Sequence, residues 1–224
     1  MSALKQTDFL IPPRSIEVAG GIFSLPPVLR IADPDTLLGE ALAAWDWQAA
    51  GEADAHVVIR RNPHLDGFDA HRLTVTPDRI EIEAGTPPAA FYAFCTLDEL
   101  RGTHGVDLPC GTVADSADFA RRGVYLDCSR GKVPTLDTLF ALIDRLASWK
   151  VNELQLYVKN VFAFGKYPEI GAGFSPFTVD DLRAIQRHCG RNHIRLVGSL
   201  AGFSHMEPIL ALPKFRPLAE LPEG

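Results

Sequence analysis

The hydrophobic period of this chain changes near residue 119, and this change constrains its fold more than any other feature. Beyond it, short apolar runs of strand length alternate with segments whose apolar residues recur every three to four positions. The runs cover residues 123–127, 151–158 and 193–200, and the helical segments between them cover 134–146 and 178–190. Strands that are joined by single helices are parallel, with right-handed crossovers. The order β-α-β-α-β therefore predicts an α/β fold that begins either a doubly wound sheet or a (β/α)8 barrel.

Residues 1–118 contain segments with the apolar spacing of strands and segments with the apolar spacing of helices. Apolar and polar residues alternate over residues 71–84 on either side of a Pro-Asp turn, which predicts a hairpin that is buried on one face. Two prolines open a helix over residues 86–100, because proline is tolerated in a first turn. Apolar residues at helical spacing predict a further helix over residues 35–50. A sheet with helices packed against it is an α+β domain.

The composition narrows the range of partners. The formal net charge is −6, from 22 Lys and Arg against 28 Asp and Glu, so we expect no nucleic-acid partner. No apolar stretch is long enough to cross a bilayer, and the first residues do not resemble a secretory leader, so we expect no membrane association and a cytoplasmic location. The four cysteines are widely spaced, which predicts free thiols and neither a metal nor another cofactor. They are Cys95, Cys110, Cys128 and Cys189.

In parallel α/β folds the functional residues gather at the carboxyl ends of the strands. Three segments follow the predicted strands: 127–130, 159–162 and 202–205. Each also has a structural interpretation, since Asp127 and Arg130 form an ion pair that holds a loop equally well, and a lysine such as Lys159 is usually a solvated rim charge. The sequence contains no glycine-rich phosphate loop, no GxSxG elbow and no HExxH motif.

The segment Arg122-Gly123-Val124-Tyr125-Leu126-Asp127-Cys128-Ser129-Arg130 resembles the entry to the catalytic barrel of glycoside hydrolase family 20, the β-N-acetylhexosaminidases. Residues 131–137, 149–156 and 203–206 are similar to the helix, strand and turn that follow in that family. Upstream, a hairpin followed by a helix resembles, in layout only, the small zincin-like α+β domain that commonly precedes this barrel. The resemblance implies an α+β domain over residues 1–118, followed over 119–224 by the first β-α-β-α-β portion of a truncated (β/α)8 TIM barrel.

The resemblance also implies roles for single residues. The family's sugar-binding arginine falls on Arg122, whose guanidinium can hold two vicinal hydroxyls; the structural alternative is an ion pair at the bottom of the barrel. The family's histidine after the third strand falls on His205, which would support the acid chemistry through a hydrogen bond. The family usually places an acidic residue after the second strand, where this chain has Lys159 and Asn160. Asn160 can still bind a sugar, while Asp127 and Arg130 would support the site.

The catalytic pair of the family is missing from this segment. Members of the family cleave by substrate assistance and carry an adjacent Asp-Glu pair after the fourth barrel strand. The only adjacent Asp-Glu pair here, Asp98-Glu99, falls within a predicted helix of the first half. Residues 119–224 are also fewer than half of the about 250 residues that a barrel needs. We therefore assign no catalytic residue.

The functional prediction is a glycosidase for terminal β-linked N-acetylhexosamine that is inactive as this chain alone. The alternatives are a non-catalytic carbohydrate-binding or interaction module and an unrelated doubly wound protein. Three strands cannot close a barrel, so we expect a second chain or a missing segment to complete it. The apolar face expected to line the barrel interior, and to lack its opposite wall, comprises Val124, Leu126, Leu154 and Leu156.

Overall fold

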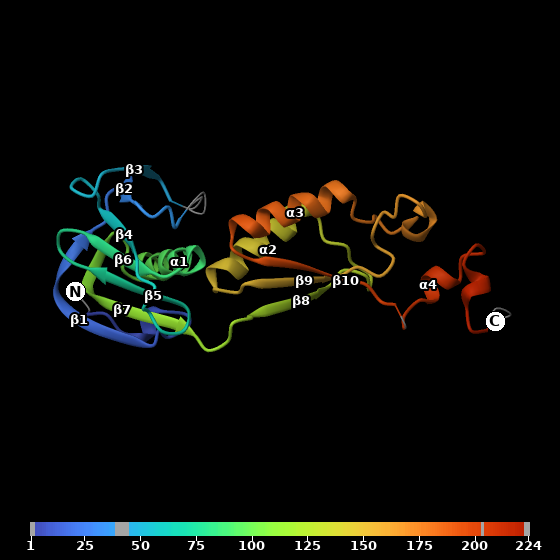
Figure 1. Ribbon diagram of the computed structural model, residues 1–224, viewed down its shortest axis with the longest axis horizontal. Coiled ribbons are helices and arrows are strands. Elements are labelled where there is room, and N and C mark those ends of the chain that lie inside the picture. Colours follow the sequence, from blue (N-terminus) through green and yellow to red (C-terminus); the bar gives the residue numbers. More distant parts are fainter. Residues whose placement is uncertain (1–2, 39–44, 203, 222–224) are drawn as a thin grey trace. The chain divides into compact units, whose positions relative to one another are not determined.

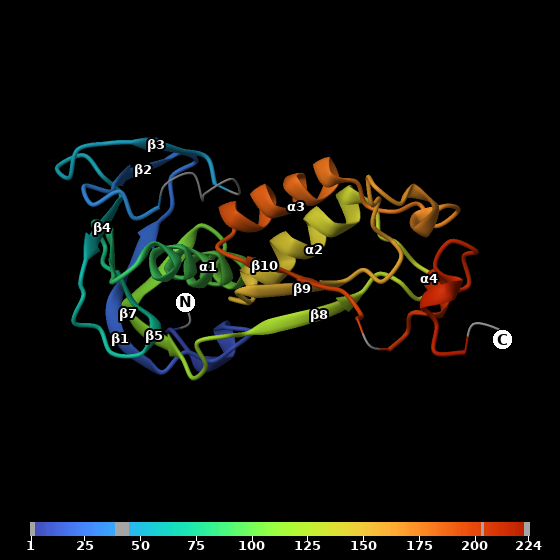
Figure 2. The ribbon, with the colours of Figure 1, turned by 45° about the vertical axis from the view of Figure 1, so that its right-hand side comes forward.

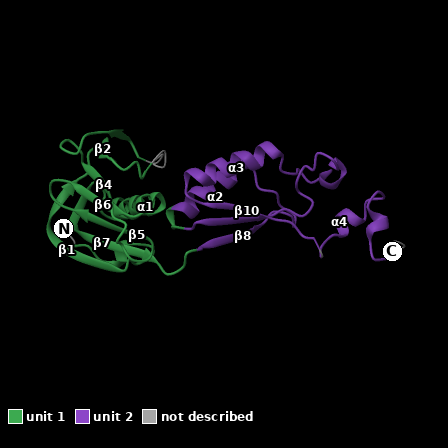
Figure 3. Ribbon diagram, in the orientation of Figure 1, with its two compact units in different colours: residues 1–120, 148–150 green, residues 121–147, 151–224 purple. Residues whose placement is uncertain are grey.

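A computed structural model describes residues 3–38, 45–202 and 204–221. Its contacts divide the chain into two compact units, shown in Figure 3. Unit 1 comprises residues 1–120 with 148–150, and unit 2 comprises residues 121–147 with 151–224. The division falls after residue 120, against the boundary after residue 118 that the sequence suggests.

Unit 1 is built around a seven-stranded mixed sheet in the order β1-β7-β5-β6-β4-β2-β3 (Figure 1). A short 3-10 helix, η1 (Gln6–Asp8), precedes it, and α1 (Pro87–His104) packs against it. The strands are β1 (Ser15–Ser24), β2 (Leu29–Ala32), β3 (Trp47–Ala49), β4 (Val57–Arg61), β5 (Phe68–Val75), β6 (Ile80–Ala84) and β7 (Asp107–Ala117). The mixed sheet with its helix is the α+β architecture expected for this half of the chain.

The hairpin and helix of unit 1 form for the reasons that the sequence gives. β5 and β6 pair antiparallel, with Leu73 opposite Ile82, and both side chains are fully buried. The Thr86 hydroxyl caps α1 by accepting a hydrogen bond from the amide of Ala89, and the helix ends at Gly105, where φ is +72°. The apolar side of the helix and one face of the sheet share a single core. The hairpin and the proline-initiated helix are therefore confirmed.

The helix predicted over residues 35–50 is wrong where the structure describes it. Residues 39–44 lie outside the described part of the chain, and Trp47–Ala49 form β3, which pairs parallel with β2. The buried residues Leu37 and Leu38 are not assigned to a helix, and the carboxylate of Asp33 accepts hydrogen bonds from both of their amides.

Unit 2 follows the predicted order β-α-β-α-β. Its three strands form a parallel sheet in the order β10-β9-β8, and Figures 1 and 2 show α2 and α3 on the same side of that sheet. The Thr178 hydroxyl and the Asp181 carboxylate form a capping box that starts α3. The elements are β8 (Gly123–Asp127), α2 (Leu136–Ser148), β9 (Glu153–Tyr157), η2 (Pro168–Gly171), α3 (Val179–Arg191), β10 (Arg195–Ser199), α4 (Glu207–Leu210) and η3 (Arg216–Leu218).

The assignment of sheet faces in unit 2 requires a correction. Leu154 and Leu156 are 0% and 2% exposed, which places them on the side that the helices cover. In the parallel register, Val124 lies beside Leu154 and Leu126 beside Leu156, so all four share that side. The opposite face instead carries alternate residues such as Tyr125, which is 56% exposed. The open face of this sheet is therefore not the apolar face that the sequence suggested.

Candidate functional site

The carboxyl ends of the three parallel strands lie in one row. Asp127 pairs with Tyr157, and Tyr157 pairs with Ser199. The register continues past the strand ends, because the amide of Cys128 donates to the carbonyl of Tyr157 and the amide of Val158 donates to the carbonyl of Ser199, both at 3.0 Å. The loops that follow the strands therefore begin at fixed positions along this edge.

Asp127 organises the loop after β8. Its Oδ1 accepts hydrogen bonds from the amide and from the hydroxyl of Ser129, each at 2.8 Å, and its Oδ2 lies 2.9 Å from the Arg130 guanidinium. Burial alone would raise the pKa of Asp127, but the hydrogen bonds from Ser129, followed by the charge of Arg130, hold this pKa below its ordinary value. The carboxylate is therefore kept ionised, and it positions Arg130 at the sheet edge.

Two tyrosines that sequence reasoning missed lie beside this pair. The Arg130 guanidinium lies 5.9 Å from the centroid of the Tyr157 ring, and Tyr125 stacks on Tyr157 with centroids 5.8 Å apart. Both belong to the open face of the sheet, since they alternate with the leucines that the helices cover. Because tyrosines and leucines alternate along the strands, they point to opposite faces of the sheet. The sequence-based assignment of the leucines to the open face therefore led away from the tyrosines. Tyr157 is 7% exposed and Tyr125 is 56% exposed, so Tyr125 and the Arg130 guanidinium are the groups that this face offers to a ligand.

Asn160 lies just past the end of β9, in a turn closed by the hydrogen bond from the amide of Val161 to the carbonyl of Val158, at 2.9 Å. The residue is only 3% exposed. This turn places Asn160 at the carboxyl edge of the sheet.

Arg122 does not lie with these residues. It precedes β8, at the amino end of the strand, where its amide donates to Oδ1 of Asn152 at 2.8 Å. With a rise of about 3.3 Å per residue, the strand separates Arg122 from the loop that carries Arg130 by about 16 Å. His205 follows β10 as an exposed residue with φ +57°, and it forms no hydrogen bond with the described residues. The structure thus brings Asp127, Arg130 and Asn160 to one edge and leaves Arg122 at the other.

The loops after β9 and β10 contact each other. Lys214 lies 2.9 Å from Glu169 and 4.6 Å from the centroid of the Tyr167 ring. Tyr167 in turn packs edge-on against Phe215, with centroids 5.2 Å apart. These contacts hold the two loops together beyond the carboxyl edge. The segment after β10 therefore stabilises the loop after β9, which carries Asn160.

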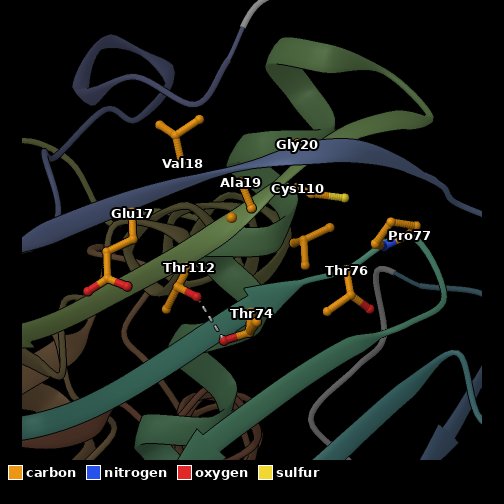
Figure 4. Close-up of a pocket in the computed structure, with 11 residues that line it drawn as sticks. Glu17, Val18, Ala19, Gly20, Thr74, Thr76, Pro77, Cys110 and Thr112 are labelled. Atoms are coloured by element: carbon orange, nitrogen blue, oxygen red, sulfur yellow. Dashed lines mark hydrogen bonds between the residues drawn. The ribbon is translucent and has the colours of Figure 1, made fainter.

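A cavity of about 220 Å³ lies elsewhere, on the sheet of unit 1 (Figure 4). Its lining comes from β1, β5, β7 and the turn after β5, and includes Glu17, Thr74, Pro77 and Thr112. None of the predicted site residues lines it. Two of its hydroxyls are already engaged, since those of Thr74 and Thr112 hydrogen-bond to each other at 3.2 Å. We therefore place the candidate site at the carboxyl edge of unit 2.

The described residues show neither a metal cluster nor a membrane-spanning helix. Their His, Cys, Asp and Glu side chains form no group of three or more that could hold a metal ion. None of their helices combines the length and hydropathy that a membrane span requires.

Comparison with known proteins identifies relatives of both units. Residues 10–116 match the family model described as glycosyl hydrolase family 20, domain 2. A β-hexosaminidase of Akkermansia muciniphila is 33% identical over 93 residues, which are 40% of this chain and 19% of that protein. A β-hexosaminidase of Vibrio furnissii is 32% identical over 155 residues, which are 64% of this chain and 25% of that protein. The chain thus spans a quarter or less of these relatives.

Solved structures share the fold. A β-N-acetylhexosaminidase from Bacteroides fragilis aligns over 92% of this chain and 47% of its own, with a TM-score of 0.80 and 21% identity. An exo-β-N-acetylglucosaminidase from Vibrio harveyi, solved in complex with N-acetylglucosamine, aligns over 96% of this chain and 39% of its own, with the same TM-score and identity. The alignments extend across both units, and the chain spans less than half of either structure.

Proposed function

Because the chain belongs to glycoside hydrolase family 20, we propose that it supplies part of the substrate site of a β-N-acetylhexosaminidase. The substrate would be a glycan that ends in β-linked N-acetylhexosamine. The observation that carries the proposal is the carboxyl edge at which the Arg130 guanidinium lies over the Tyr157 ring and the exposed Tyr125 ring stacks on Tyr157.

The chemistry of this edge suits a sugar ring. Carbohydrates present an apolar face of C–H groups and a rim of hydroxyls, and the edge offers an aromatic face with donors and acceptors around it. The forked guanidinium of Arg130 can donate to two vicinal hydroxyl oxygens at once. The amide of Asn160 can donate to one hydroxyl and accept from another. Since substrate sites of parallel α/β folds lie at the carboxyl ends of the strands, Arg130 is better placed for this role than Arg122.

The finer architecture that we propose is the first part of a (β/α)8 barrel. The three strands are parallel and in sequential order, and α2 and α3 cover the same face, as the outer helices of a barrel do. The open face with Tyr125 and Tyr157 would then line the interior of the barrel. Closure needs eight strands with consistent tilt and shear, so further strands, from a missing segment or from a second chain, would complete it.

Hydrolysis would depend on that completion. The resemblance assigns proton donation to an adjacent Asp-Glu pair, and the only such pair in this sequence, Asp98-Glu99, lies within α1 of unit 1. The acetamide of the substrate serves as nucleophile in this mechanism, so the enzyme contributes the acid and the orientation of the sugar. We therefore expect this chain to bind the sugar without cleaving it.

Binding of N-acetylglucosamine, measured by saturation-transfer NMR, tests the proposal. Arg130→Ala is expected to weaken binding by about tenfold, as the loss of a charge-assisted hydrogen bond predicts, and Arg122→Ala by less than about twofold. The reverse ranking would restore the assignment of Arg122, and absence of binding by the unmodified chain would contradict the proposed function. In parallel, a chromogenic N-acetyl-β-glucosaminide should not be turned over. Turnover by this chain alone would show that it contains a proton donor.

A further inference from the structure

A cluster of titratable side chains is buried where residues 148–150 pack in unit 1. Lys150 belongs to the turn between α2 and β9 and adopts a φ of +59°, and this turn is part of unit 1. Nζ of Lys150 lies 2.8 Å from Oδ2 of Asp115 on β7, and the two side chains are 14% and 12% exposed. A largely buried ion pair therefore anchors the turn.

His71 on β5 interacts with both members of this pair. The residue is 3% exposed. Burial, followed by the charge of Lys150, lowers the pKa of His71 to about 4, whereas the carbonyl of Asp69 and the charge of Asp115 act in the opposite direction. The imidazole is therefore uncharged at neutral pH, and its cation would repel the Lys150 ammonium.

The hydrogen bonds of His71 suit both of its protonation states. Its Nδ1 lies 3.1 Å from the carbonyl of Asp69, which can only accept, so Nδ1 carries a proton in either state. Its Nε2 lies 3.2 Å from the Thr96 hydroxyl, which itself lies 3.0 Å from the carbonyl of Tyr92. In the neutral state the hydroxyl donates to Nε2. In the cation Nε2 donates to the hydroxyl, which turns to the carbonyl of Tyr92, so protonation requires one hydroxyl rotation and no local unfolding.

Helix α1 contributes further titratable groups around Lys150. The charge of Lys150 acts on the Glu99 carboxyl and on the Cys95 thiol, and Asp98 adds negative charge beside both. Burial raises the pKa of Cys95 to about 12, so the thiol stays uncharged, and burial also raises the pKa of Glu99. As the pH falls, the cluster therefore loses an anion at Glu99 and gains a cation at His71, and both changes weaken the attraction that holds Lys150.

We propose that this cluster is an acid-sensitive switch, in which protonation of His71 releases Lys150 and the turn 148–150 while the sheet and α1 of unit 1 stay folded. The coupling is reciprocal: because Lys150 disfavours the His71 cation, the cation disfavours the docked position of Lys150 by the same factor. The long, flexible side chain of a lysine can move to solvent, whereas the imidazole on β5 cannot.

Two NMR signals followed from pH 7 to pH 3.5 test the switch: the His71 imidazole and the indole N–H of Trp149, which precedes Lys150 in the turn and is assigned with Trp149→Phe. Both signals are expected to change with a common midpoint, while far-UV circular dichroism stays constant over that transition. His71→Gln, which cannot acquire the charge, should move the Trp149 transition to lower pH by about one pH unit.

His56→Gln is the matched control. His56 is another histidine of unit 1 whose pKa burial lowers, and its Nδ1 accepts a hydrogen bond from the amide of Arg30 at 3.0 Å. This variant should leave the Trp149 transition unchanged. In the reciprocal experiment, Lys150→Met should raise the midpoint of the His71 titration by about one pH unit, which corresponds to about tenfold in docking, and Lys150→Arg should leave it unchanged because the charge is kept.

Three outcomes would overturn the proposal. The Trp149 signal could stay constant while His71 titrates, or His71→Gln could leave the Trp149 transition in place. The Trp149 signal and the circular dichroism could also change together, because acid would then unfold unit 1 as a whole. If Lys150→Met fails to fold, the comparison with His71→Gln still decides, since it leaves Lys150 in place.

Discussion

Arg122 and Arg130 lie at opposite ends of strand β8, the first at the amino end and the second just past the carboxyl end. Arg130 is held there by Asp127, whose Oδ2 is 2.9 Å away. The carboxyl end is the functional end of a parallel sheet. Of the two arginines in the family-like segment, the geometry therefore favours Arg130 for contact with a substrate.

Asp127→Asn should weaken sugar binding with little change in stability. The Arg130 side chain is 62% exposed, so its ion pair with Asp127 contributes less than about 1 kcal/mol to folding. The variant nevertheless loses the charge that positions the guanidinium over Tyr157. Thermal melts should show a nearly unchanged midpoint, and NMR titration should show weaker binding of N-acetylglucosamine. A large drop in the melting midpoint without loss of binding would assign Asp127 a purely structural role.

The stability of unit 1 should fall with acid because of His71. This residue is 3% exposed, its Nδ1 lies 3.1 Å from the carbonyl of Asp69 and its Nε2 lies 3.2 Å from the Thr96 hydroxyl. Burial, followed by the charge of Lys150, lowers the pKa of His71 to about 4. Between this value and the unfolded pKa of about 6.5, the unfolded chain binds more protons than the folded one, so stability rises with pH across that window.

The expected contribution of His71 is about 3 kcal/mol, fully present above pH 6.5 and lost as the pH falls to 4. Urea unfolding at several pH values between 4 and 7 measures it. His71→Gln removes the titrating group, so the difference between the two pH profiles isolates this residue from carboxylates such as Glu99, whose pKa burial raises. Parallel profiles would contradict the prediction.

Replacing only one residue of the ion pair between Lys150 and Asp115 should lower the free energy of unfolding substantially. Nζ of Lys150 lies 2.8 Å from Oδ2 of Asp115, and the two side chains are 14% and 12% exposed. Burial would raise the pKa of Asp115, but Lys150 lowers it below its ordinary value through charge and a hydrogen bond. Lys150→Met leaves a buried carboxylate without this partner and should cost about 3–5 kcal/mol of unfolding free energy.

The double variant Lys150→Met with Asp115→Leu is the control for this pair. It removes both charges, and much of the lost stability should return because no ionised group is left buried and unpaired. Urea melts of the single and double variants form a double-mutant cycle. Purely additive losses would show that the two residues act independently.

Periodicity was sufficient to predict most of unit 2, because its strands and helices are separated by clear changes of spacing. It did not show which side of the sheet the helices cover, since Leu154 and Leu156 alternate with Gln155 and Tyr157 whichever face is buried. Only the three-dimensional packing settles this point, and with it the exposure of Tyr125. The family-like segment contains two arginines. The strand pattern already placed Arg130 after the strand and Arg122 before it, but the family resemblance assigned the sugar to Arg122.

Unit 1 was less predictable, because several of its strands depend on partners distant in the sequence. β7 contains Pro109 and Gly111 and lacks a regular alternation, yet it pairs with β1 on one side and with β5 on the other. β3 is only three residues long and exists through its pairing with β2. Long-range pairing therefore overrode the local helical pattern at Trp47, as tertiary context often does for short strands.

The loop that carries Asn160 should be sensitive to substitution at Gly171. A Cβ atom at this position would lie 2.8 Å from Cγ of Pro176 and 3.3 Å from the carbonyl oxygen of Phe162. The proline ring is rigid and the carbonyl belongs to the backbone, so neither can move away easily. Gly171→Ala should therefore cost about 1–3 kcal/mol of local stability, as overpacking does. We also expect it to loosen the loop and to weaken sugar binding through Asn160.

Gly165→Ala is the matched control in the same loop, because no atom lies within 4 Å of a Cβ placed there. Hydrogen exchange over residues 158–178 and NMR titration with N-acetylglucosamine measure the two effects. Gly171→Ala should raise exchange and lower affinity, whereas Gly165→Ala should leave both close to those of the unmodified chain. Faster exchange with unchanged affinity would separate the loop from the binding site, and indistinguishable variants would show that the packing around Gly171 relaxes without cost.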